Sequence, residues 1–242
     1  KGLSYEPNQI VVSSGAKQTL YNAMQVLVQP GDEVIVPVPY WVSYIEQIKL
    51  AGAEARVVET REDNGFKLTA DELEQAINPR TRLLILNTPN NPTGAVYTRE
   101  ELAALAQVIM QHDIMVLSDE IYGKLVYDGC NHCSIASISP ELKDRTVIIN
   151  GVSKAYAMTG WRISYAACNA KLAKAMTDLQ SHSTSNANSI AQAASVAAIS
   201  GDQSPTEMMR NEFQKRRNYM LERLRAIPGI TCSRPDGAFY LF

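Results

Sequence analysis

Ten consecutive residues combine a serine, a lysine and an arginine at a spacing that suits an aldehyde bearing a phosphate. Ser153 and Lys154 close an apolar segment, and Arg162 follows after a turn that contains glycine. A lysine that forms a Schiff base must lie in a partly desolvated pocket that favours its neutral amine, and a nearby arginine suits a phosphate. The stretch therefore predicts an anchor for pyridoxal phosphate (PLP). The spacing alone also fits two surface cations, the commoner use of such a pair.

A carboxylate at a strand end suits the other half of this chemistry. Removal of a proton from a substrate carbon needs an electron sink, and the PLP ring serves best when a facing carboxylate keeps its nitrogen protonated. Asp119 is the candidate, because it follows the apolar run Ile114–Leu117 and Tyr122 lies one turn further on. The alternative interpretations are a helix N-cap for Asp119 and a core aromatic side chain for Tyr122.

Two more motifs end apolar segments. Asn91 and Pro92 follow one of them, where both residue types also suit an ordinary turn. Gly15 and Ala16 follow the strand-like segment 9–12 and open an amphipathic helix, so free backbone N–H groups and the helix dipole would face a phosphate. Helix starts of this kind also occur without a ligand.

Taken in order, these four motifs resemble the fold-type I PLP enzymes of the class I aminotransferase family. The resemblance covers nearly the whole chain. The stretches 39–44 and 154–162 look especially like the bacterial aspartate aminotransferase branch, which carries a lysine in its first glycine motif, as Lys17 does here. The resemblance implies PLP-dependent transamination of an L-amino acid, aspartate in the first instance, with 2-oxoglutarate as the acceptor.

The resemblance also implies a cofactor site, residue by residue. It implies that Lys154 forms the Schiff base and that the carboxylate of Asp119 faces the ring nitrogen. Tyr122 and Asn91 would hydrogen-bond the ring oxygen and so tune the pKa of the Schiff base. Trp41 would stack on the ring face. The implied cofactor contacts are Gly15, Ala16, Lys17, Trp41, Asn91, Asp119, Tyr122, Ser153, Lys154 and Arg162. Ser153, Arg162 and the glycine motif would hold the phosphate.

The implied reaction is a ping-pong transamination with Lys154, Asp119 and Tyr122 as catalytic residues. The amino acid displaces Lys154 from the internal aldimine, and the freed amine moves a proton from the substrate α-carbon to the cofactor. The implied substrate-binding residues are Trp41, Asn91 and Lys17. Lys17 would lie near the distal carboxylate of a dicarboxylic substrate, whereas the alternative is a solvated lysine in a first helical turn.

Two other functions fit the same residues. Another PLP reaction, such as that of a β-lyase, a cyclopropane-forming synthase or an aromatic aminotransferase, would share Lys154, Asp119, Tyr122 and Arg162, and product identity would separate it from the leading function. A non-catalytic sensing domain would keep the fold without turnover. A helix-turn-helix segment in the full-length protein would support that alternative.

Composition narrows the class of protein. The chain has 242 residues, 45% of them apolar and 20% charged, with a formal net charge of −2, which fits a globular enzyme without a nucleic-acid partner. No apolar stretch reaches the roughly twenty residues of a membrane span, and no targeting segment is visible, so we expect a cytoplasmic location. Cys130 and Cys133 form a lone C-x-x-C pair, which favours reduced thiols over a metal site.

Short β-rich segments alternate with helical patterns and predict a doubly wound α/β fold around a mostly parallel, seven-stranded sheet. The strands are expected at 10–13, 33–38, 54–59, 82–88, 114–119, 146–150 and 163–168. Thr69 and Thr98 begin two helices as capping boxes with Glu72 and Glu101. Residues 1–200 are expected to form a PLP-binding large domain. Residues 201–242 would begin a small domain, with a helix at 206–226 and strand-like segments at 230–233 and 237–242.

Both ends of the chain look cut relative to the family. Family members carry N-terminal residues that close over the substrate and a C-terminal arginine that clamps its α-carboxylate, and Arg234 lies upstream of that position. We therefore expect this stretch to bind PLP better than it transaminates. Because the family's active sites form between two subunits, we expect a homodimer for the intact protein.

Overall fold

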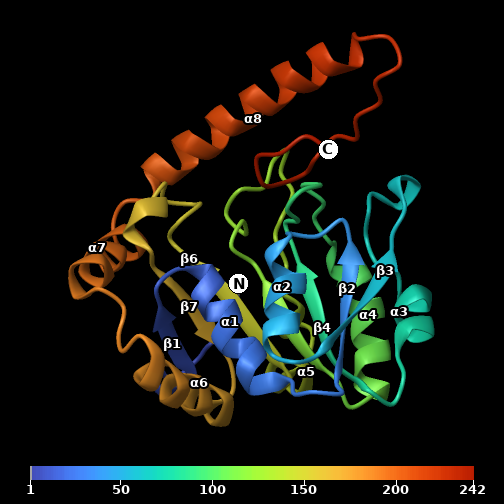
Figure 1. The fold of residues 1–242 in the computed structure, drawn as a ribbon. Coiled ribbons are helices and arrows are strands. Elements are labelled where there is room, and N and C mark those ends of the chain that lie inside the picture. Colours follow the sequence, from blue (N-terminus) through green and yellow to red (C-terminus); the bar gives the residue numbers. More distant parts are fainter. Residues whose placement is uncertain (1) are drawn as a thin grey trace.

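A seven-stranded sheet forms the centre of the computed structural model, which describes residues 2–242 (Figure 1). The strand order is β1-β7-β6-β5-β4-β2-β3, and β7 alone runs antiparallel to its neighbours. The strands are β1 (Ile10–Ser13), β2 (Glu33–Val38), β3 (Glu54–Glu59), β4 (Thr81–Asn87), β5 (Met115–Asp119), β6 (Thr146–Gly151) and β7 (Ser164–Ala167). The predicted fold class is confirmed, and each strand lies within one residue of its predicted bounds.

Helices cover both faces of the sheet (Figure 1). One face packs on α1 (Ala16–Leu27), α2 (Ser43–Leu50) and α6 (Ala170–Ser183), and the other on α3 (Ala70–Ala76), α4 (Arg99–Gln111) and α5 (Pro140–Asp144). In β4, Leu83 and Ile85 join the first core while Leu84 and Leu86 join the second. A strand buried on both faces needs apolar residues at every position, which is why this segment is continuously hydrophobic.

Side chains begin two of these helices as the sequence predicts. Thr69 accepts a hydrogen bond from the backbone N–H of Glu72 at 3.2 Å, and Thr98 accepts one from Glu101 at the same distance. Each glutamate returns a bond to the backbone N–H of its threonine. Both predicted capping boxes are therefore confirmed, and they fix where α3 and α4 leave the loops that follow β3 and β4. Short 3-10 turns occupy Pro7–Gln9, Glu62–Asn64, Ile135–Ser137 and Thr159–Trp161.

The last third of the chain is helical and then irregular. After α7 (Ser189–Ser200), the long helix α8 (Ser204–Arg225) extends above the sheet, and the chain then turns back over the site end of the sheet (Figure 1). The strands predicted at 230–233 and 237–242 are wrong, because the β-pairing of this segment is limited to an isolated bridge between Val126 and Gly237. An extended segment becomes a strand only when its backbone pairs with a neighbouring strand over several residues, and one bridge does not supply this.

Candidate active site

A cavity of about 270 Å³ opens where β4, β5 and β6 end. Because β1 runs parallel to β6, and β7 antiparallel to it, the residues that follow β1 and those that precede β7 meet at the same end of the sheet. The cavity is lined by Ala16, Lys17, Trp41, Tyr44, Asn87, Asn91, Asp119, Ile121, Tyr122, Ser153, Lys154, Thr159, Arg162 and Tyr240. The structure thus brings every predicted site residue to one cavity except Gly15, which lies directly behind it against Arg162.

Lys154 points its amine into this cavity between aromatic rings. Its Nζ lies 5.7 Å from the centroid of the Tyr122 ring and 5.5 Å from that of Phe239. Burial lowers the pKa of the Lys154 amine, and the guanidinium of Arg162 lowers it further, against the opposing effect of the Asp119 carboxylate. A lowered pKa enlarges the fraction of neutral amine, which is the form that attacks an aldehyde.

The glycine motif and Arg162 form a cradle at one end of the cavity. Gly15 stands at the N-cap of α1 with φ of 88°, and a β-carbon there would lie 2.2 Å from Nη2 of Arg162. Arg162 itself adopts a left-handed backbone conformation, and its Nη1 donates to the carbonyl of Thr159 at 2.9 Å. A cation set against an uncapped helix start suits a phosphate group.

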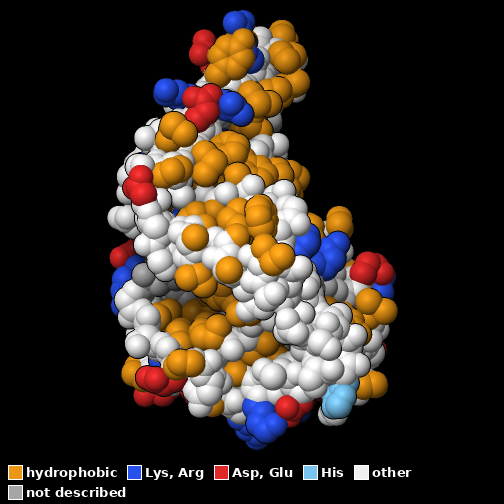
Figure 2. Space-filling view, turned by 90° about the vertical axis from the view of Figure 1, so that its left-hand side faces the viewer, with side chains coloured by type: hydrophobic (Ala, Val, Ile, Leu, Met, Phe, Trp, Pro, Cys, Tyr) orange, Lys and Arg blue, Asp and Glu red, His pale blue; other side chains and the backbone are white. Residues whose placement is uncertain are grey.

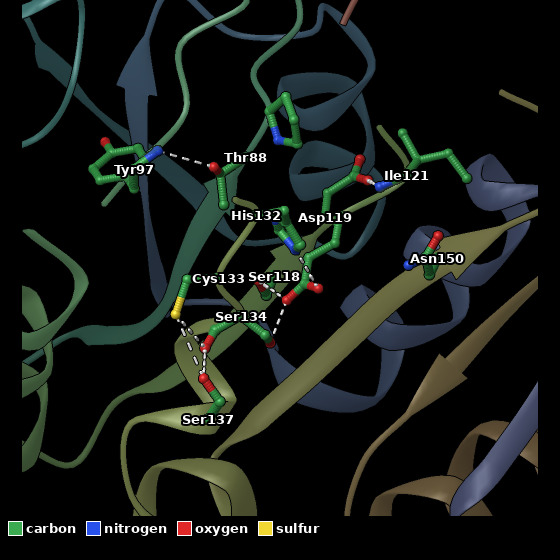
Figure 3. A network of polar contacts seen from close by, with 12 residues as sticks. Thr88, Tyr97, Ser118, Asp119, Ile121, His132, Cys133, Ser134, Ser137 and Asn150 are labelled. Atoms are coloured by element: carbon green, nitrogen blue, oxygen red, sulfur yellow. Dashed lines mark hydrogen bonds and ion pairs between the residues drawn. The ribbon is translucent and has the colours of Figure 1, made fainter. Parts of the chain in front are cut away.

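Asp119 also lines the cavity and is buried. Its Oδ2 accepts a hydrogen bond from the Tyr44 hydroxyl at 2.8 Å. Its Oδ1 accepts one from the backbone N–H of Ile121 at 3.2 Å (Figure 3). A turn, not a helix, follows the strand, so the helix N-cap interpretation of Asp119 is wrong. The carboxylate instead caps a turn and keeps one edge toward the cavity.

Tyr122 and Asn91 reach the same cavity from separate loops. The Tyr122 hydroxyl lies 2.6 Å from that of Tyr240, and burial first, then this hydrogen bond, raise the Tyr122 pKa. The backbone N–H of Asn91 donates to Oδ1 of Asn87 at 2.8 Å, and Nδ2 of Asn87 donates to the Asp119 carbonyl at 2.9 Å. Asn87 therefore ties the Asn91 loop to the end of β5.

Lys17 and Trp41 lie together at the cavity wall. Nζ of Lys17 is 5.0 Å from the centroid of the Trp41 ring, and the Tyr44 ring meets Trp41 edge to face at 5.5 Å. Nε2 of Gln47 donates to the Lys17 carbonyl at 2.8 Å, which fixes the backbone of that first helical turn. The arrangement places one cation beside a broad aromatic surface, as a substrate with a second carboxylate would need.

Behind Asp119, a buried polar network anchors the neighbouring residue Glu120 (Figure 3). Its carboxyl group accepts from the hydroxyls of Ser118, at 3.0 Å, and Ser134, at 2.5 Å, and lies 2.9 Å from Nε2 of His132. Successive residues at a strand end point to opposite sides, so this network holds the backbone from below while Asp119 faces the cavity. Cys130 and Cys133 flank His132 as free thiols.

Five of the cavity residues were not predicted to belong to the site, namely Tyr44, Asn87, Ile121, Thr159 and Tyr240. Tyr44 sits one helical turn after Trp41, and that spacing could have suggested it. Asn87 precedes the Asn91 motif at the end of its strand, which is a second available signal. Tyr240 carries no signal at all, because it lies far along the chain from its partner.

Within residues 2–242, no helix is long and apolar enough to cross a membrane, and no group of three or more His, Cys, Asp or Glu side chains could hold a metal ion.

Curated relatives align with this chain over its whole length. An aspartate aminotransferase of Geobacillus stearothermophilus is 58% identical over 242 residues, which are all of this chain and 62% of the relative. An aspartate/prephenate aminotransferase of Cereibacter sphaeroides is 50% identical over 242 residues, which are 60% of its length. The chain thus spans about three fifths of the length of these relatives.

Solved structures agree with this similarity. The aspartate aminotransferase of Rhizobium meliloti superimposes with a TM-score of 0.98 at 46% identity, over all of this chain and 60% of the other. An aromatic aminotransferase of Pyrococcus horikoshii gives 0.96 at 36% identity, over all of this chain and 65% of the other. The family model for aminotransferases of class I and II matches residues 1–242. The chain therefore belongs to the class I and II aminotransferase family.

Proposed function

We propose that the protein is a PLP-dependent aminotransferase that transfers the amino group of an L-amino acid, aspartate in the first instance, to 2-oxoglutarate by a ping-pong mechanism. The observation that carries this proposal is the meeting, in one cavity, of an amine of lowered pKa with a cation at a helix start and a buried carboxylate. Each of these three features serves a different part of one cofactor.

The residues of the cavity fit PLP. Lys154 would hold the aldehyde carbon covalently, while Arg162, Ser153 and the uncapped start of α1 would hold the phosphate. The β-carbon that Gly15 lacks would occupy the space of the guanidinium, so the glycine is what lets the cation and the helix start meet. Bound PLP supplies the electron sink for proton removal at the substrate α-carbon.

The other side chains orient and protect this group. Asp119 would keep the ring nitrogen protonated, and Tyr44 holds the carboxylate in place through its hydroxyl. Tyr122 and Asn91 would donate to the ring oxygen, and Trp41 would cover the ring face. The Lys154 amine, once free, takes the proton from the substrate α-carbon and delivers it to the cofactor side, acting as base and then as acid.

Lys17 supports a dicarboxylic substrate. It is a cation beside Trp41 in the wall of the cavity. We expect Lys17→Gln to lower kcat/KM for aspartate by about tenfold or more and to leave that for phenylalanine nearly unchanged. Equal losses on both substrates would assign Lys17 to the fold or the cofactor and would favour an aromatic substrate.

The proposal is tested by reduction with borohydride in the presence of PLP. The unchanged protein should gain the mass of one reduced cofactor, and Lys154→Ala, prepared in parallel, should gain none. Aspartate added before reduction should prevent the adduct and yield oxaloacetate. Release of pyruvate, ammonia and sulfide from cysteine, which carries a leaving group on its β-carbon, would instead indicate a β-lyase. An adduct that persists with every amino acid offered would favour the non-catalytic sensing domain.

A homodimer is part of the proposal. Helix α7 exposes Ile190, Val196 and Ile199, and Figure 2 shows hydrophobic side chains gathered on that side of the molecule. Large apolar side chains exposed together in this way are typical of an interface between proteins. Light scattering after size-exclusion chromatography should give twice the chain mass, and Ile190→Glu should give the monomer. A monomer before substitution would refute this part of the proposal.

A further inference from the structure

Two tyrosine hydroxyls meet at the cavity, and one of them comes from the end of the chain. The Tyr240 and Tyr122 oxygens are 2.6 Å apart, and their rings meet edge to face with centroids 5.8 Å apart. Both side chains line the cavity that also holds Lys154. Tyr122 is 3% exposed, so its hydroxyl has few alternatives to the partners inside the cavity.

The segment that carries Tyr240 is held by its backbone. The N–H groups of Asp236 and Gly237 donate to the Gly94 carbonyl at 3.1 and 2.9 Å, and the N–H of Ala238 donates to the Leu125 carbonyl at 2.9 Å. A β-carbon on Gly94 would lie 2.3 Å from Pro235, so the two loops are in close contact. Tyr240 is thus presented to the cavity from a fixed backbone.

The proton count of the pair limits what it can do. Each phenol has one proton to donate, and its oxygen can also accept. If Tyr240 donates to Tyr122, the Tyr122 proton stays available to an acceptor in the cavity, and the donated bond strengthens Tyr122 as a donor in its turn. If Tyr122 donates instead, its only proton goes to the Tyr240 oxygen, and none is left for the ring oxygen of the cofactor. Burial keeps Tyr122 protonated at neutral pH, so it has that proton to offer.

We propose that Tyr240 is a positioning residue that donates to the Tyr122 hydroxyl and thereby directs the Tyr122 proton to the ring oxygen of PLP. This inference rests on the proposed function. A donor at the ring oxygen stabilises negative charge there, so the proton shared along the linkage between cofactor and Lys154 is held less tightly. Tyr240 therefore lowers the pH at which the visible absorbance of the bound cofactor changes.

The test is a pH titration of that absorbance in the protein loaded with PLP. We expect Tyr240→Phe to raise the midpoint by about half a unit to one unit, the worth of one hydrogen bond. Tyr122→Phe should raise it further. The double variant should match Tyr122→Phe alone, because Tyr240 acts only through Tyr122. Tyr97→Phe is the matched control, since it removes a buried hydroxyl that accepts from the Leu68 N–H at 2.6 Å in the core on the other face of the sheet.

Three results would overturn the inference. An unchanged midpoint in Tyr240→Phe would do so, as would a shift that adds to that of Tyr122→Phe or an equal shift in Tyr97→Phe. Should Tyr240→Phe fail to fold, 3-fluorotyrosine at position 240 keeps the hydroxyl as a stronger donor and should lower the midpoint, and no change would count against the inference. Absence of any absorbance band that depends on Lys154 would instead remove the proposed function, and this inference with it.

Discussion

The α-carbon of Gly15 lies against the guanidinium of Arg162, with no space for a side chain between them. A β-carbon there would be 2.2 Å from Nη2, and the backbone φ of 88° already disfavours any other residue. We expect Gly15→Ala to displace Arg162 from the start of α1 and to raise the Kd for PLP by about tenfold or more. Fluorescence titration with PLP measures the change.

Gly31 provides the control for Gly15. Its φ is 95°, and nothing lies within 4 Å of a β-carbon built there. Gly31→Ala should therefore cost about 1 kcal/mol of folding free energy through backbone strain alone, with PLP affinity unchanged. If both variants bind PLP as the unchanged protein does, the close contact between Gly15 and Arg162 does not serve the cofactor.

Asp119 and Tyr44 should differ in their effect on the half-reaction with aspartate. Asp119→Asn keeps the shape of the side chain and removes its charge, so we expect the rate of the half-reaction to fall by about 100-fold or more. Tyr44→Phe removes only the hydrogen bond at 2.8 Å and should slow it by about tenfold. Stopped-flow absorbance gives both rates. Equal losses would mean that orientation, and not charge, is what Asp119 contributes.

Lys154 should lower the stability of the protein in the absence of cofactor. Its folded-state pKa lies below the ordinary value of 10.5, so the unfolded chain binds more protons between the two values and stability rises with pH there. At a pH below the lowered folded-state value, the burial penalty is fully present. Lys154→Met should therefore be more stable at pH 7, by about 0.5 kcal/mol for a partly exposed side chain.

That difference should shrink as the pH rises through the lowered pKa toward 10.5. Urea unfolding at pH 7 and at pH 10 measures it. Lys49→Met is the control, because Lys49 is 63% exposed and pairs with Glu46 at the surface. A gain in Lys154→Met that is the same at both pH values would show that packing, and not the proton, is responsible.

The chain offers two histidine–glutamate pairs that differ in burial. His132 and Glu120 are 4% and 0% exposed, whereas His112 and Glu74 are 30% and 51% exposed, at nearly equal distances of 2.9 and 3.0 Å. We expect His132→Leu to cost about 2–3 kcal/mol and His112→Leu less than about 0.5 kcal/mol. Thermal unfolding compares them. Equal costs would mean that burial adds nothing to the Glu120 network.

The sheet was predictable because its central strands are recognisable from their runs of apolar residues. The middle of a strand covered on both faces is apolar at successive positions, and residues 83–86, 115–117 and 147–149 are of this kind. The same runs located the site, since polar residues that follow parallel strands gather at one end of the sheet. The resemblance to the family's motifs then predicted Asn91 and Asp119 as site residues, and both line the cavity.

The irregular parts were not predictable in the same way. The segments 230–233 and 237–242 have strand-like composition, but a strand also needs a partner, and pairing is a property of the whole fold. The contact of Tyr240 with Tyr122 arises from hydrogen bonds of the intervening backbone to the Gly94 and Leu125 carbonyls. No local pattern encodes such a contact.

The pairing of β1 with β7 also orders the assembly of the protein in time. Ile10 pairs with Ala167, and β1 has no other neighbour in the sheet. The ribosome synthesises β1 and the glycine motif early, but β1 can pair only after β7 has been synthesised. Contacts between such distant segments are slow to form. Of the motifs that meet at the cavity, the first to be synthesised therefore reaches its final place only after the last has been made.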